Sequence, residues 1–432
     1  MSTNEMRFKC IDMFFMYPFA LSSLEVLNHW EHLYNFDGGA LNSEDPEYLP
    51  PYIKLRSEYD KLLLKSEEVD CQLMIPTSAA NPLAPHSAKI SAEIILKKNG
   101  GGCCIFRVGI KSPPDTSFSV EHALTFTLIE DYSSVFTLTS PISFGSNFDE
   151  IRNGGQLFQL FEEAVGNLIS ASSKEFQNKI REESLASRKL FIDEEYQHPY
   201  VMTVARLAEG SPYDYIAKSS TNSAKNRCDL ASLLIRTYAP SGEGADTIDD
   251  TYLHHTTEMN HEGLANLYPF QHLFANIHYR SCFAVHGKYN ENKQLEDYGE
   301  KYINQLKYSV VTARIQWFTL LLLNARIDDL LGRTALSAFD LIEGRLKDKQ
   351  NENFQEFLET IIKLRTSVSL ALNDPVSYGH AAGSFSHLFR RMTTLFRIDK
   401  LEASLQVKLQ AVDRMYDDLR ELYRLNLTKR SE

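Results

Sequence analysis

Two apolar runs joined by a glycine-rich turn occur at residues 93–110, EIILKKNGGGCCIFRVGI. Glu93–Leu96 and Cys104–Ile110 have the composition of strands, and the asparagine and glycines between them supply the positive-φ residues that a hairpin turn needs. Gly100–Gly102 resembles a phosphate loop only superficially, because a strand rather than a helix N-terminus follows it. Residues 93–110 therefore predict an antiparallel hairpin.

Further strands and a helix are expected on both sides of this hairpin. Leu124–Ile129 and Val135–Thr139 alternate apolar and polar residues around a short polar turn, which is typical of a second half-buried hairpin. Residues 156–170 place apolar side chains at helical spacing and are expected to cover the sheet. Another apolar strand begins near His198.

Two apolar stretches need to be weighed as targeting or membrane segments. Residues 10–21, CIDMFFMYPFAL, loosely resemble a signal peptide, but Asp12 and Pro18 interrupt them and no cleavage site follows. An early buried strand is the better interpretation. Trp317–Leu323 is far shorter than the ~20 apolar residues that span a bilayer. We therefore expect no transmembrane helix within this chain.

The clearest linker is SGEGADTIDD, residues 241–250, which is small and acidic and has no apolar face. It divides the chain into a mixed α/β, sensor-like domain at residues 1–240 and a helical part at 251–432. The fold class predicted is α+β: an N-terminal domain with antiparallel hairpins, followed by a long-helix bundle or stalk.

Four long helices are predicted after the linker, at Leu264–Val285, Asp297–Leu331, Asn353–Leu372 and Asp399–Leu427. The last has an a/d seam in which apolar residues are spaced four, three, four, three, four. The seam comprises Leu405, Leu409, Val412, Tyr416, Leu419 and Tyr423. It fits an antiparallel bundle within one chain, and it fits equally a stalk packed against copies of itself.

Composition limits the function classes. The chain has 432 residues, of which 43% are hydrophobic, so it can bury a sizeable core. With 57 acidic against 45 basic residues its formal charge is −12, which argues against a dedicated nucleic-acid binder. The 6 cysteines form no C-x-x-C pair and no secreted disulfide framework, so a reducing cytoplasm is expected.

No standard catalytic or nucleotide-binding motif is present, and no catalytic or cofactor residue is assigned. The one candidate metal cluster is His254, Glu258 and His261, which share a helix face at i, i+4, i+7. Since it has no partner cluster and follows an acidic linker, a solvated surface is favoured over a metal site. Asp328–Asp329 is expected to form an internal salt bridge, and the basic end of residues 378–391 is expected to pair with acidic neighbours.

The order of elements in the C-terminal half resembles the cytosolic part of CorA-like proteins, relatives of CorA-type magnesium channels. The resemblance is carried by aromatic-rich Tyr268–Val285, by the apolar middle of residues 307–330, by a helix with Phe354, Phe357 and Leu358, and by a break at Asn373–Gly383 before the heptad helix. In that family the last helix continues into two membrane helices, and a Gly-Met-Asn signature selects hydrated magnesium. This sequence has no Gly-Met-Asn, so no pore residue is carried over.

The resemblance implies a non-enzymatic homo-oligomer, a pentamer by analogy, in which ligand binding at domain interfaces biases a closed against an open arrangement. It implies a divalent-cation or nucleotide ligand, without naming a binding residue, and some relatives are membrane effectors of bacterial antiviral defence. The protein would be cytoplasmic as given, or associated with the inner membrane if it continues beyond Glu432.

Three functional hypotheses follow. The first is the sensing and gating region of a CorA-like channel or effector. The second is a soluble helical interaction or regulatory protein without transport activity. The third, and least favoured, is a metal-dependent hydrolase built on His254, Glu258 and His261.

Overall fold

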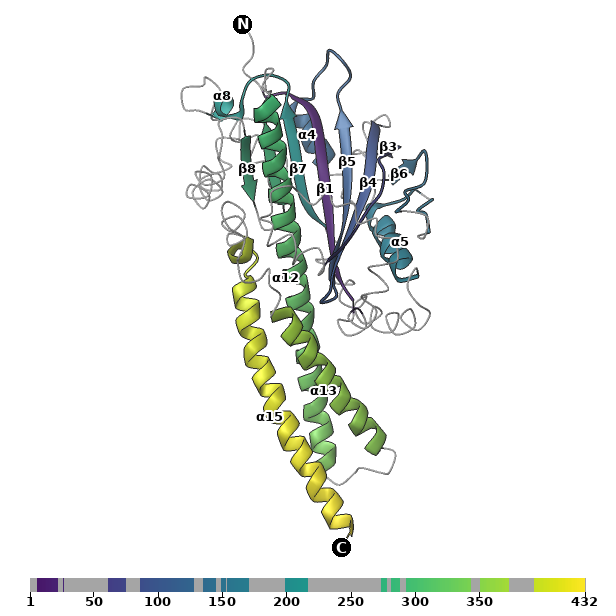
Figure 1. Cartoon of the computed structure of the whole chain (residues 1–432), viewed down its shortest axis with the longest axis vertical. Helices are drawn as coiled ribbons and strands as arrows, with labels where there is room; N and C mark the ends of the chain where they lie inside the picture. The colour runs from purple at the N-terminus through teal and green to yellow at the C-terminus, as the bar shows by residue number, and fades with distance from the viewer. Residues whose placement is uncertain are drawn as a thin grey trace, which may run out of the picture.

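A computed structural model of the chain shows its arrangement (Figure 1). The structure describes residues 6–21, 26, 61–74, 86–127, 135–144, 149–152, 154–170, 199–216, 273–277, 281–287, 293–342, 350–372 and 392–431.

The strands form one sheet of nine within the described residues. They are β1 (Phe8–Ala20), β2 (Lys61–Lys65), β3 (Val69–Met74), β4 (His86–Lys97), β5 (Gly101–Lys111), β6 (Val135–Leu138), β7 (Tyr200–Leu207), β8 (Leu273–Ile277) and β9 (Ser281–His286). Their order is β6-β3-β4-β5-β1-β7-β9-β8, and β2 also pairs with β4. All neighbours are antiparallel except β7 and β9, which are parallel.

Helices lie on both faces of this sheet and extend beyond it (Figure 1). They are α4 (Val120–Thr127), α5 (Leu157–Ser170), α8 (Pro212–Ile216), α12 (Lys293–Ile342), α13 (Gln350–Leu372) and α15 (Ile398–Ser431). The α+β class predicted from the sequence is confirmed.

The predicted glycine-turn hairpin is confirmed as β4 and β5. Gly100 adopts φ +87°, and its N–H donates to the Lys97 carbonyl at 2.9 Å. The Asn99 side-chain oxygen accepts from the N–H of Gly101 at 3.0 Å. These local bonds fix the register that places Leu96 opposite Gly102. The early strand at residues 10–21 and the strand near His198 are also confirmed, as β1 and β7.

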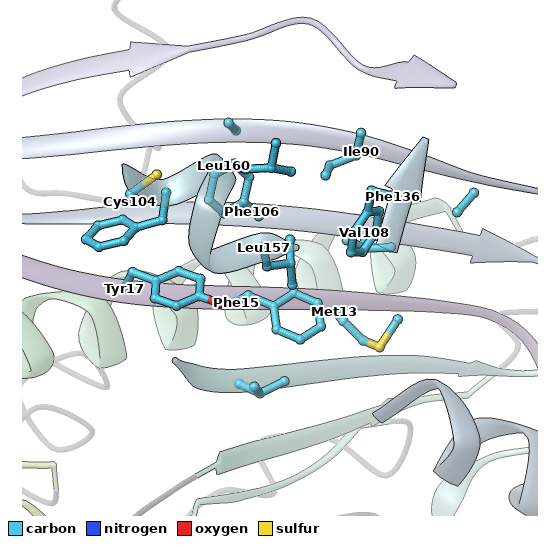
Figure 2. Packing of buried hydrophobic residues seen from close by; sticks show 14 of the residues in the cluster. Met13, Phe15, Tyr17, Ile90, Cys104, Phe106, Val108, Phe136, Leu157 and Leu160 are labelled. Atoms are coloured by element: carbon cyan, nitrogen blue, oxygen red, sulfur yellow. The ribbon is translucent and has the colours of Figure 1, made fainter. Parts of the chain in front are cut away.

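One face of the sheet is covered by α4, which contacts β1, and α5, which contacts β5. Alternate side chains of the central strands point into this core, as expected for period-2 strands. The Tyr17 and Phe161 rings are stacked there, with centroids 4.9 Å apart. Figure 2 shows further members of the cluster: Met13, Phe15, Ile90, Cys104, Phe106, Val108, Phe136, Leu157 and Leu160.

The opposite face of the sheet is covered by α12. Its apolar residues pack with the other set of strand side chains, which includes Phe14, Met16, Cys103 and Ile105. Helix α12 then runs past the end of the sheet, α13 returns along it, and α15 runs again toward the far end, where the C-terminus lies (Figure 1). The predicted helices at Asp297–Leu331, Asn353–Leu372 and Asp399–Leu427 are confirmed, with α12 longer than expected.

The predicted strand at Leu124–Ile129 is wrong where the structure describes it, because residues 120–127 form α4. Ser119 begins this helix: its carbonyl accepts from the Ala123 N–H, and its hydroxyl accepts from the His122 N–H. Ala123 and Phe126 are both buried, and their spacing of three suits a helix packed on β1. The strand at 135–138 is confirmed, but it pairs with β3 instead of a hairpin partner.

The predicted helix at Leu264–Val285 is wrong where the structure describes it, since β8 and β9 lie there. All six residues of β9 are buried, so the alternation that marks a half-exposed strand is missing from its sequence. The expectation that the whole of 251–432 is helical is therefore wrong at these strands. The sheet takes strands from both sides of the predicted linker, and residues 241–250 themselves lie outside the described ranges.

The heptad seam packs within the chain along the first part of α15. Leu405 and Val412 are fully buried, and Leu409 and Tyr416 are partly buried against the core that α12 and α13 share. The structure describes no side chain at Leu419 or Tyr423. Packing of the seam within the chain is therefore confirmed for these four positions, although α15 runs parallel to α12 and is not antiparallel to it as expected. Packing between copies stays a prediction.

Helix α12 approaches β5 so closely that only glycine fits at Gly101. A Cβ there would lie 2.7 Å from Thr319 Oγ1 and 2.8 Å from Ile315 Cγ2.

We expect Gly101→Ala to lower the free energy of unfolding by about 1–3 kcal/mol through overpacking. Denaturant unfolding would measure this. Gly332→Ala is the control: Gly332 is exposed in α12 with open space around it, so alanine should raise stability by about 1 kcal/mol. Equal effects of the two substitutions would contradict the close approach.

Candidate functional site

The candidate metal ligands His254, Glu258 and His261 lie outside the described residues, as does the basic stretch at 378–391. In the parts of the chain that the structure does describe, no group of three or more His, Cys, Asp and Glu side chains is placed to hold a metal ion. The predicted salt bridge of the 328–329 pair is confirmed, because Lys408 Nζ donates to Asp328 at 2.6 Å.

What the structure brings together instead is a set of polar side chains around α12. An ion pair joins α12 to the middle of the sheet: Lys307 Nζ lies 3.1 and 3.2 Å from the two carboxylate oxygens of Glu93 on β4. The side chains of Lys307 and Glu93 are 7% and 20% exposed. The ammonium also lies 5.4 Å from the centre of the Phe14 ring and 5.1 Å from that of Tyr308. This is a largely desolvated pair, in which each charge depends on the other.

A second ionic cluster lies beside the first on the same face, where the sheet is more exposed. Arg107 on β5 donates to Asp12 on β1 and to Glu68 before β3, at 3.1 and 2.8 Å. Burial alone would lower the pKa of Arg107, but the charges of Asp12, Glu68 and Glu93 and the hydrogen bond to Asp12 outweigh it, so the pKa lies above its usual value. Because Arg107 already has two carboxylate partners, this cluster carries a net negative charge and does not favour an anion site.

A buried arginine lies two helical turns beyond Lys307. The Arg314 guanidinium is 4.0 Å from the centre of the Trp317 ring, 5.3 Å from that of Phe396 and 5.5 Å from that of Tyr200. These distances are within the range of cation–π contacts. We call these four residues the Arg314 cluster. Its members come from α12, from β7 and from the turn that precedes α15.

Hydrogen bonds continue along the contact between α12 and α15. Gln316 donates to Glu402 at 2.7 Å, and the Asn324 amide donates to the Leu401 carbonyl at 3.2 Å and accepts from the Ser404 hydroxyl at 3.1 Å. Together with Asp328 and Lys408, these contacts join residues about 80 apart in the sequence. The nearly constant offset means that the two helices are parallel and in a defined register.

The buried thiols do not offer reactive groups. Burial, with the charge of Asp70, raises the pKa of Cys71 to about 12. Burial likewise raises the pKa of Cys103, Cys104 and Cys282 far above the usual value. A thiol acts as a nucleophile only when it is ionised, so these cysteines are inert near neutral pH. The polar residues around α12 are suited to fixing the positions of the sheet and the helices.

The sequence analysis missed Lys307, Arg314 and Asn324 as organising residues. All three lie inside the apolar segment at 307–330, where the sequence analysis expected a helix and, apart from the salt bridge at Asp328–Asp329, no polar contacts. Lys307 and Arg314 are seven residues apart and therefore share a helix face, and a basic residue repeated on the apolar face of a helix is a usable signal of buried pairing.

No known family model, curated protein or solved structure matches the chain. Among the described helices, α12 and α15 included, none combines the length and the apolar character needed to cross a membrane.

Proposed function

We propose that this chain is the sensing and gating region of a CorA-like channel or effector, without enzymatic activity of its own, and that it works as a homo-oligomer. The proposal rests on the arrangement in which one long helix is fixed to a sheet at one end and carries a second long helix beside it. In this arrangement, the two helices can transmit a displacement of the sheet to their far end.

One observation carries the oligomer part of the proposal. Helix α15 packs through Leu405 and Val412, yet on its outer side Val407 is 68% exposed and Leu425 is 55% exposed. The two lie 18 residues apart, which is five helical turns, so they share a face. We assign this outer face to contact between copies, with an exposed apolar side chain near each of its ends.

The charges on this face allow identical helices to pair. Arg414 and Asp418 lie between Val407 and Leu425 on the same side, four residues apart, and both are exposed. A neighbouring copy would present the same two charges, so that Arg414 of one copy could meet Asp418 of the next. Opposite charges across a helix interface set the register and the choice of partner.

The remaining parts of the proposal come from the CorA resemblance. The ligand would be a divalent cation or a nucleotide, bound at domain interfaces, and the protein would function at the cytoplasmic side of the inner membrane. A role in antiviral defence belongs to the same proposal. The described polar clusters assign no residue to the ligand.

The mass of the chain in solution tests the proposal. We expect light scattering over a range of concentrations to give a ring-sized multiple of 49.4 kDa. Val407→Glu combined with Leu425→Glu should shift the mass to that of the monomer, because it introduces a carboxylate at each end of the contact face. Ile362→Glu, at a 51% exposed position of α13, is the matched control and should leave the mass unchanged.

A wild-type chain that stays at 49.4 kDa at every concentration would contradict the oligomer and favour a helical interaction protein that binds a different partner. If the double variant and the Ile362→Glu control disrupted the oligomer equally, the contact between copies would not be specific to the outer face of α15.

A further inference from the structure

We propose that the Arg314 cluster is a conformational joint: it holds the start of α15 to the sheet, and α15 can change direction only when the contact between Arg314 and Phe396 opens. This inference does not depend on the proposed function, because it concerns one contact within a single chain.

The first step is that the cluster joins three separate elements. Tyr200 begins β7, Arg314 and Trp317 belong to α12, and Phe396 lies in the turn just before α15. Tyr200 and Phe396 are each 1% exposed, and their rings meet edge to face with centroids 5.6 Å apart. Arg314 thus contacts the two aromatic rings by which the sheet and the α15 turn touch one another.

The second step concerns the turn itself. Arg397, the residue after Phe396, has φ +54°, which is uncommon for a residue with a side chain. Its carbonyl accepts from the N–H groups of Lys400 and Leu401, so the first turn of α15 is built on it. Strained backbone of this kind persists where surrounding contacts hold it. The packing of buried Phe396 in the Arg314 cluster is such a contact. It sets the direction in which α15 extends from the turn at Phe396 and Arg397.

The third step places the charge of Arg314 over the sheet. Burial raises the pKa of both Cys103 on β5 and Tyr200 on β7, and the positive charge of Arg314 partly opposes this rise at each. The guanidinium is therefore close to two strands of the sheet as well as to the α15 turn. A planar cation can make favourable contacts with several aromatic faces at once. An apolar side chain of similar length cannot make these cation–π contacts.

Hydrogen exchange of the full chain, followed by mass spectrometry, tests the joint. In Arg314→Met we expect residues 392–402 to exchange at least about tenfold faster, while β5 and β7 stay within about twofold of the wild type. Arg314→Lys keeps a cation over the rings and should restore part of the protection. Arg365→Met is the control: it removes the 2.9 Å ion pair between α13 and Asp413 of α15 and should leave residues 392–402 unchanged.

Phe396→Leu provides a second variant if Arg314→Met does not fold. It removes the ring from the α15 side and leaves Arg314 with Tyr200 and Trp317, and we expect the same local acceleration. Unchanged exchange at 392–402 in either variant would overturn the proposal. So would equal acceleration in the sheet and in α15, because the cluster would then contribute to general stability without controlling α15.

Discussion

Lys307→Met is expected to lower the free energy of unfolding by about 3 kcal/mol, because it leaves the Glu93 carboxylate without its ammonium partner in a site that is mostly closed to water. The side chain of Glu93 is 20% exposed, and Phe14 and Tyr308 lie beside Lys307. Methionine is nearly as long as lysine, so little of the loss should come from a cavity. Urea unfolding followed by circular dichroism would measure the change.

The double variant Lys307→Met with Glu93→Leu separates the cost of an unpaired charge from the cost of lost packing. Replacing both members of a buried pair by apolar residues of similar size is often neutral, so we expect the double variant to lie within about 1 kcal/mol of the wild type. If the double variant were as unstable as the single one, the pair would not be the reason for the loss. Arg107, whose pKa responds to Glu93, should then be examined as a further partner of that carboxylate.

Local chemistry explains which parts of the fold could be predicted from the sequence. The hairpin of β4 and β5 depends on Asn99 and Gly100, whose conformations and hydrogen bonds lie within the turn. The helices at the C-terminal end repeat apolar residues over many turns, so their period is distinct even without knowledge of their partners. In both cases the information needed is present within one segment.

Non-local burial explains the errors. β9 pairs with β7, which begins about 80 residues earlier, and it is buried on both faces, so its sequence lacks the alternation of a half-exposed strand. The segment that forms α4 alternates apolar and polar residues like a strand. As a helix, however, it packs on β1 and buries both Ala123 and Phe126. Tertiary contacts override local preference in such segments.

The candidate site was out of reach for the same reason. Lys307 and Glu93 are 214 residues apart, and neither position is unusual in its own segment. Arg314 lies among apolar neighbours in the sequence, while two of its three aromatic contacts come from β7 and the α15 turn. The residue types could be noticed in the sequence, but their partners follow only from the path of α12 across the sheet.

Stability should depend on pH through His286, the last residue of β9. It is 3% exposed, and burial, with a smaller contribution from the charge of Arg206, lowers its pKa to about 4. Arg206 lies opposite His286 on β7 and is paired with Glu300 of α12 at 3.3 Å. In the unfolded chain the pKa of His286 has its ordinary value near 6.5. Between pH ~6.5 and pH ~4 the imidazole is therefore protonated in the unfolded chain and neutral in the folded chain.

The free energy of unfolding should therefore be highest above pH ~6.5 and fall as the pH is lowered through 4, by up to about 3 kcal/mol from this residue. His286→Leu removes the titrating group, so the stability difference between wild type and variant should be constant above pH ~7 and should change in favour of the variant below it. Carboxylate titrations are common to both proteins and cancel in that difference. A difference that stays constant from pH 7 to pH 4 would show that His286 is protonated equally in the folded and unfolded chains, and an NMR titration of its imidazole would locate the reason.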